Sequence, residues 1–278
     1  MQSFTLKRYR AGVILIYALA AAALVVAVFY DLKIDIAVNN TDDGLSNWLA
    51  RTGEVPAWAL PMAAGALLAK CLANPWLKRI CALFCLAGGG LLGDYLSKHL
   101  FLDDAFRRPF GVVFGVGTAV ILLLLVRLAT VPERLRKPLI ALALTSLAVC
   151  AAATLLVTGM KALWGRTRFR EMEAPYEAFT AWYVVNGVNG HKSFPSGHTE
   201  SAAMSYLLLC LPWFSEKAKR YAWACFAVPF VFTSAVAATR LVMGAHYLSD
   251  VAAGGVIGFT CVLLGLWIYE RKIACSTI

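Results

Sequence analysis

A set of long apolar runs is the feature that most constrains this chain. The first, residues 11–30, contains no charged residue, and roughly 20 helical residues suffice to cross the hydrocarbon core of a bilayer. Similar runs follow at residues 57–69, 80–92, 110–126, 138–160, 201–214, 221–238 and 251–269. Backbone polar groups in lipid must be satisfied within a helix or a closed barrel, which excludes an open sheet. We therefore predict an all-α, polytopic membrane bundle of about 6–8 transmembrane helices.

The charged content agrees with this prediction. Only 15% of the residues are charged, whereas soluble domains carry about 25%. No repeat, low-complexity segment or Pro/Gly/Ser-rich linker divides the chain. We predict a single membrane domain over residues 1–278, with N-terminal helices in residues 1–137 and a motif-bearing core in residues 138–270.

The net charge of +10 is distributed as in a membrane protein, and not as in a nucleic-acid-binding protein. Lysines and arginines gather in alternate loops, whose only acids are Glu133, Glu216 and Glu270. The positive-inside rule places these loops in the cytoplasm. Both termini are then predicted to be cytoplasmic, and the setting to be a bacterial inner membrane. The basic residues before the first run also permit a signal peptide, but the length of that run favours an uncleaved helix.

Two further features complete the organisation of the chain. The eight cysteines lie mostly in or beside the apolar runs and show no CxxC spacing, which gives no support to a metal site. The polar segment at residues 31–56 places Leu45, Trp48 and Leu49 on one helical face. We predict an interfacial helix on the outer surface there.

Three groups of residues at predicted outer helix ends carry the chemistry. They are Lys161 with Arg168, the turn Pro195-Ser196-Gly197-His198, and Arg240 with His246 and Asp250. Ionisable residues near membrane depth are costly and are candidate functional residues. Lysine and arginine suit a phosphate, and the backbone N–H groups at a helix N-terminus point toward an anion. An aspartate four residues from a histidine can fix its tautomer and leave the other ring nitrogen free to attack.

These three groups closely resemble the signature motifs of the type 2 phosphatidic acid phosphatase superfamily, in order, spacing and location. The resemblance covers residues 161–250 and extends to the anion cradle of vanadium haloperoxidases. It implies a lipid phosphatase that needs no cofactor or metal. It also implies residue roles: His246 as nucleophile, His198 as general acid, Asp250 as the partner of His246, and a phosphate site made of Lys161, Arg168, Ser196, Gly197 and Arg240.

The sequence departs from the family pattern at two positions. Phe169 replaces the usual proline, and Thr239 replaces the usual serine and keeps its hydroxyl. Arg166 and Arg170 flank Arg168 and are weaker candidates for contact with substrate. The expected substrate is a lipid phosphate such as undecaprenyl pyrophosphate, phosphatidylglycerol phosphate, phosphatidic acid or a lipid A phosphate. A lipid phosphotransferase and a phosphate or anion transporter remain alternatives.

Overall fold

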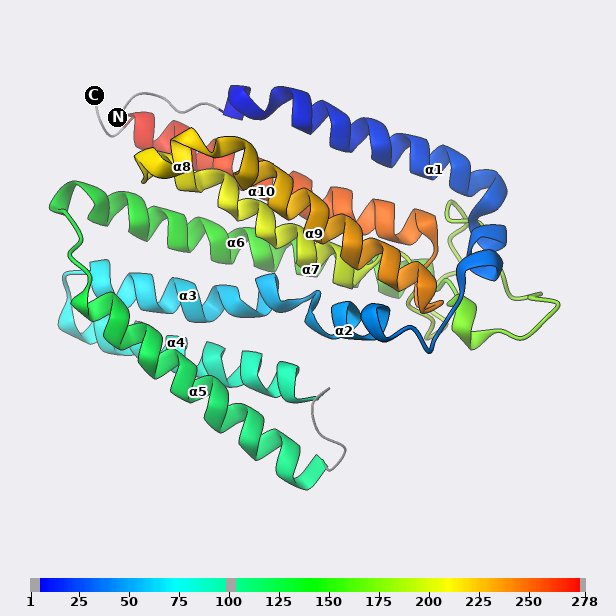
Figure 1. Ribbon diagram of the computed structural model, residues 1–278, viewed down its shortest axis with the longest axis horizontal. Coiled ribbons are helices and arrows are strands. Elements are labelled where there is room, and N and C mark those ends of the chain that lie inside the picture. Colours follow the sequence, from blue (N-terminus) through cyan, green and yellow to red (C-terminus); the bar gives the residue numbers. More distant parts are fainter. Residues whose placement is uncertain (1–5, 99–103, 276–278) are drawn as a thin grey trace. The chain divides into compact units, whose positions relative to one another are not determined.

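The computed structural model describes residues 6–98 and 104–275, and all regular structure in these ranges is helical. This confirms the predicted all-α class. The elements are η1 (Leu6–Tyr9), α1 (Arg10–Val38), α2 (Gly44–Thr52), α3 (Val55–Cys71), α4 (Pro75–Ser97), α5 (Asp104–Leu128), α6 (Glu133–Trp164), η2 (Phe169–Glu171), α7 (Gly197–Ala203), η3 (Met204–Trp213), α8 (Glu216–Arg220), α9 (Ala222–Val242) and α10 (Leu248–Cys275). Their course is shown in Figure 1.

Six of the described helices are long and apolar enough to cross a membrane: α1, α4, α5, α6, α9 and α10. The chain is therefore an integral membrane protein, as its apolar runs predict. The two remaining runs also form helical structure, one in α3 and one in α7 together with η3. Both are shorter than most of the six.

The chain packs as two compact units. Unit 1 contains residues 1–54 and 151–264, and unit 2 contains residues 55–150 and 265–278. All eight predicted site residues lie in unit 1. The prediction of a single domain remains a prediction.

Unit 2 is built around a close helix pair. The helices α3, α4 and α5 run side by side in Figure 1. A Cβ atom added at Gly93 of α4 would lie 2.0 Å from the carbonyl oxygen of Gly111 on α5, and one at Gly89 would lie 2.5 Å from that of Gly115. Small residues spaced four apart on both helices let the two backbones touch, which is how helices commonly associate in lipid.

The segment after the first apolar run differs from its prediction. We predicted a polar surface segment from residue 31, but α1 continues to Val38, and Asp31 and Asp35 are buried within it. Asp31 can lie in a membrane helix because it pairs with a buried arginine of unit 1. The expected short helix does follow as α2, with Leu45 and Trp48 largely exposed.

Candidate active site

Three segments of unit 1 carry the predicted site residues. They are the end of α6 with the loop after it, the turn into α7, and the connection from α9 to α10. Lys161 lies in the last turn of α6. A Cβ atom added at Gly197 would lie 3.3 Å from its Nζ atom, so the lysine ammonium sits against the first residue of α7. The first two predicted motifs therefore meet in space.

Two glycines shape the loops that carry the arginine and the histidine. Gly165, directly after α6, has a φ angle of +55°, and Gly244, between Arg240 and His246, has a φ angle of +57°. Glycine adopts this left-handed region without the strain that a Cβ atom adds. Both turns return the chain to the site as soon as a helix has ended.

The turn into α7 is held against α10. Ser196 caps the helix through its side chain, which accepts a hydrogen bond from the Thr199 amide. Its own amide donates to the carbonyl of Asp250 at 2.9 Å. A Cβ atom at Gly254 would lie 2.1 Å from the Ser196 carbonyl oxygen. This close approach, which only glycine permits, joins the second motif to the third.

His246 and Arg240 are linked through the backbone. The Arg240 carbonyl accepts hydrogen bonds from the amides of Ala245, at 3.0 Å, and His246, at 3.2 Å. Both side chains are buried. Burial lowers the pKa of His246 to about 4; Lys161 and Arg240 add to the lowering, and Asp250 opposes it. The imidazole is therefore neutral at physiological pH, the state that a nucleophile requires.

Asp250 faces the imidazole of His246 but does not yet bond it. The distance from His246 Nδ1 to Asp250 Oδ2 is 3.6 Å, beyond hydrogen-bonding range, and Nδ1 has no other hydrogen-bond partner. Catalytic hydrogen bonds are commonly long in the absence of substrate and tighten when it binds.

A buried network holds the Asp250 carboxylate in place. Oδ1 accepts a hydrogen bond from the Arg166 guanidinium at 2.6 Å. Oδ2 accepts from the Ser193 hydroxyl at 2.5 Å and from the Tyr247 amide at 3.0 Å. Three fixed donors thus hold the carboxylate beside the histidine.

Arg166 connects this network to α1. Its guanidinium is fully buried and lies 4.1 Å from the ring centre of Tyr247. It donates to Asp31 at 2.8 Å, and Asp31 also accepts hydrogen bonds from the amide and hydroxyl of Ser249. Burial alone would lower the pKa of Arg166, but the adjacent Asp250 and Asp31 raise it above its usual value. The arginine stays charged and is committed to protein groups.

The sequence contained a signal for this network that we did not use. Asp31 and Asp35 are four residues apart, and apart from Lys33 the other residues from 32 to 38 are apolar. That pattern describes one polar stripe on a continuing helix, which must face protein instead of lipid. The partner, Arg166, cannot be identified from spacing, because 135 residues separate it from Asp31.

His198 has an acidic partner that the sequence did not reveal. Its Nδ1 atom lies 3.0 Å from Oε1 of Glu54, between α2 and α3. Burial first, and then the positive charges of Arg240, His246, Lys161 and Arg168, hold the pKa of His198 well below its usual value. The Glu54 contact leaves Nε2 as the nitrogen free to exchange a proton.

Arg168 pairs locally. Its guanidinium lies 3.3 Å from Glu171, which also contacts His191 at 3.2 Å. The neighbouring Phe169 is buried, stacks on Tyr176 at 5.2 Å, and lies against the turn at Gly244. The residue that departs from the family pattern therefore supports the turn before His246.

The comparisons agree with the motifs. Residues 142–274 match the model of the PAP2 superfamily. A search of curated proteins and a search of solved structures each found no significant match. Within the described ranges, no three histidine, cysteine, aspartate or glutamate side chains gather into a metal-binding group.

The chain is a helical membrane protein, and the match over residues 142–274 confirms the predicted resemblance to the PAP2 superfamily. The match begins in α6 and ends in α10, so it includes every residue of the three motifs. A match to this superfamily suggests phosphatase-type activity on phosphate esters.

Proposed function

We propose that this protein hydrolyses a phosphate monoester or pyrophosphate of a membrane lipid through a phosphohistidine on His246. The observation that carries the proposal is the environment of this imidazole. It is buried, it is neutral, and it faces a carboxylate that three donors hold in place. Two cations, Lys161 and Arg240, act on it electrostatically. A neutral nucleophile among positive charges suits attack on a phosphate dianion.

In the first step, Nε2 of His246 attacks phosphorus. The N–P bond forms as the P–O bond to the lipid breaks, and His198 donates its Nε2 proton to the departing oxygen. Lys161, Arg168, Arg240 and the amides at the start of α7 stabilise the charge on the remaining phosphoryl oxygens. The positive charge that develops on His246 is stabilised by Asp250.

In the second step, water replaces the lipid. His198, now neutral, accepts a proton from the water as its oxygen attacks phosphorus, and the N–P bond breaks to release inorganic phosphate. The low pKa of His198 suits this second role. A bound phosphate dianion offsets the surrounding cations and raises the pKa of His198, which permits the first role.

A groove in unit 1 supports a lipid substrate. Its volume is about 360 Å³. It is lined beside the site by Thr199, Leu248 and Val251, and away from the site by apolar side chains such as Ile16 of α1 and Phe230 of α9. On α10 the lining reaches Phe259, about 16 Å further along the helix at 1.5 Å per residue. Such a groove suits a hydrocarbon chain whose phosphate lies at His246.

Chain topology supports a site at one membrane face. Arg166, just after α6, contacts Asp31 near the end of α1 and Asp250 at the start of α10. These helix ends therefore share a face. If only the six long helices crossed the membrane, the ends of α1 and α6 and the start of α10 would not all lie at one face. One further crossing is needed between α1 and α4, and another between α6 and α9. With α3 and η3 as these crossings, α1 begins and α10 ends on the opposite face. The positive-inside rule makes that face cytoplasmic and the site periplasmic.

Phosphate release from purified protein tests the proposal. The wild type should release phosphate from a panel of lipid phosphates and pyrophosphates, while His246→Ala should release none above background and trap no ³²P-labelled protein. Equal release from both would refute His246 as nucleophile. Transfer of label to an added acceptor lipid, with no free phosphate, would identify a phosphotransferase. Phosphate flux into proteoliposomes without turnover would identify a transporter.

A further inference from the structure

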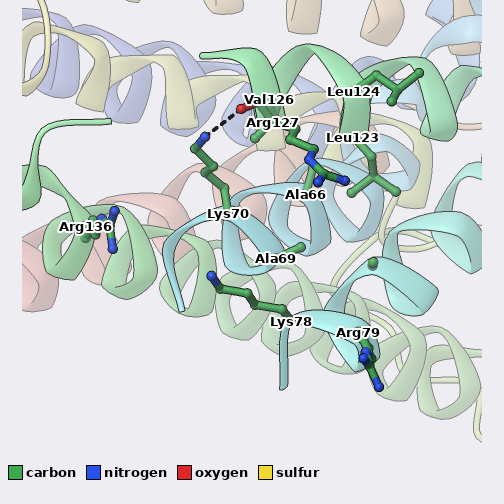
Figure 2. A pocket seen from close by; sticks show the side chains of 11 residues that line it. Ala66, Ala69, Lys70, Lys78, Arg79, Leu123, Leu124, Val126, Arg127 and Arg136 are labelled. Carbon is green, nitrogen blue, oxygen red and sulfur yellow. Dashed lines mark hydrogen bonds between the residues drawn. The ribbon is translucent and has the colours of Figure 1, made fainter. Parts of the chain in front are cut away.

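Unit 2 contains a pocket that the proposed reaction does not use. Its volume is about 580 Å³, and it is lined by the ends of α3, α4, α5 and α6. Five of its lining side chains are cationic, and none is acidic: Lys70, Lys78, Arg79, Arg127 and Arg136. Figure 2 shows these side chains around the pocket, from all four helices.

Few of these charges are neutralised. Arg136 forms an ion pair with Glu133 at 3.0 Å, and that glutamate is largely exposed. Lys70 donates to the backbone carbonyl of Arg127 at 2.8 Å. Among the residues that the structure describes, no carboxylate lies within ion-pair distance of the ammonium groups of Lys70 and Lys78 or the guanidinium groups of Arg79 and Arg127. The pocket thus has an excess of positive charge.

The pocket differs in shape from the row of basic residues that commonly flanks the cytoplasmic ends of membrane helices. The positive-inside rule explains cations at these helix ends, but it does not explain why they surround a cavity. The walls are apolar, with Leu123, Leu124 and Val126 on α5. Small residues, Ala66 and Ala69 on α3 and Ala82 on α4, leave the space open. Cations beside an apolar wall match a ligand with an anionic head and a hydrocarbon body.

The position along the helices also fits a lipid. Arg136 is near the start of α6, whereas Lys161 is in its last turn. A helix that crosses the bilayer places its two ends near the two membrane surfaces. The pocket is lined by such helix ends, so it lies at the level of lipid head groups.

We propose that this pocket binds the phosphate-bearing head group of an anionic phospholipid, with the acyl chains against α5. Basic pockets between transmembrane helices on the cytoplasmic side bind such head groups. Phosphate itself is also available from soluble esters, so the shared chemistry is a phosphate anion and the experiment must separate the two sources. The inference does not depend on the proposed hydrolysis.

A matched pair of variants tests this proposal. Lys78→Gln/Arg79→Gln removes two cations from the pocket, including an arginine stacked on Trp76 at 4.9 Å. The control, Lys217→Gln/Arg220→Gln on α8, removes the same charge outside the pocket, including an arginine over Tyr221 at 5.7 Å. Binding of phosphatidylglycerol, phosphatidylcholine and glycerol 3-phosphate to detergent-solubilised protein is measured by native mass spectrometry.

We expect the pocket variant to bind phosphatidylglycerol roughly 30-fold more weakly than wild type, because each lost cation weakens binding about fivefold. The control should stay within threefold of wild type, and phosphatidylcholine should bind weakly to all three proteins. Equal losses in both double variants would overturn the pocket in favour of a diffuse positive surface. Glycerol 3-phosphate binding as tightly as phosphatidylglycerol would overturn the lipid assignment. Because none of these variants changes a site residue, phosphate release by each of them reports separately on the proposed function.

Discussion

Replacement of Arg166 gives the sharpest test of how the site is supported. This side chain has no exposed surface and bonds four acceptors: the carbonyl of Thr180, the hydroxyl of Ser249, and the carboxylates of Asp250 and Asp31. From its spacing in the sequence, Arg166 is expected to flank the phosphate site. The structure predicts that it positions Asp250 and does not contact substrate.

The magnitude follows from the two carboxylates. Arg166→Met leaves Asp31 and Asp250 buried without their shared cation, and breaking a buried ion pair by removing one partner costs about 3–5 kcal/mol of unfolding free energy. Asp31→Asn alone leaves Arg166 paired with Asp250 and should cost about 1–3 kcal/mol. The double variant should be more stable than the sum of the two losses predicts, because it leaves one unpaired carboxylate instead of two.

Unfolding in mixed micelles measures these energies, and steady-state phosphate release measures the effect on catalysis. Arg166→Lys keeps the charge but cannot bond four separated acceptors. A displaced Asp250 should lower kcat by roughly tenfold to a hundredfold, with KM changed by less than about threefold. Arg168→Lys serves as the control, because we propose that the Arg168 guanidinium binds phosphate, and its KM should rise.

Two results would refute this reasoning. Energies for Arg166→Met and Asp31→Asn that add within about 0.5 kcal/mol would mean that the two residues do not interact in the folded protein. A higher KM with an unchanged kcat for Arg166→Lys would mean that the arginine contacts substrate.

Three further predictions concern other parts of the chain. Glu54→Gln removes the negative partner of His198 at 3.0 Å. The pKa of His198 should therefore fall, and the basic limb of the kcat–pH profile should move to lower pH by about one unit. A basic limb that does not move would exclude this partnership. Gly93→Ala places a Cβ atom 2.0 Å from a carbonyl oxygen of α5 and should lower the unfolding free energy by about 1–3 kcal/mol. In the control, Gly90→Ala, the added Cβ atom would lie 3.5 Å from its nearest neighbour, so the unfolding free energy should change little. Phe169→Pro should preserve phosphate release within about threefold, since the preceding residue already has the extended conformation that proline requires. The melting temperature should fall, because the ring contact with Tyr176 is lost. A complete loss of release would show that the phenylalanine ring serves catalysis.

The sequence predicted the helices well because each depends on local hydrophobicity. All eight apolar runs form helical structure, and only their ends were uncertain. The prediction failed at α1, where the run was ended at the first acid. Hydropathy treats Asp31 as exposed, because it does not include the arginine that neutralises this carboxylate.

The candidate site was predictable to a different depth for different residues. The groups that we propose to meet phosphate follow short spacing rules, so the sequence alone is sufficient to single out Lys161, His198 and His246. Groups that position them come from distant parts of the chain. Glu54 contacts His198, which lies 144 residues later in the sequence, and Asp31 accepts a hydrogen bond from Ser249, which lies 218 residues later. No local pattern records such pairs, because any acid of suitable reach satisfies the same geometry.

The placement of Arg166 also bears on how tightly a site with four nearby basic side chains would bind phosphate. Its charge is divided between Asp31 and Asp250, so it contributes little attraction to a bound phosphate. Arg168 is partly neutralised by Glu171 in the same way. Moderate binding of the phosphate leaves more of the electrostatic stabilisation for the transition state, where the phosphoryl charge is redistributed. In the proposed mechanism Asp250 therefore has two effects: it faces and positions His246, and it neutralises Arg166 so that the ground state is not bound too tightly.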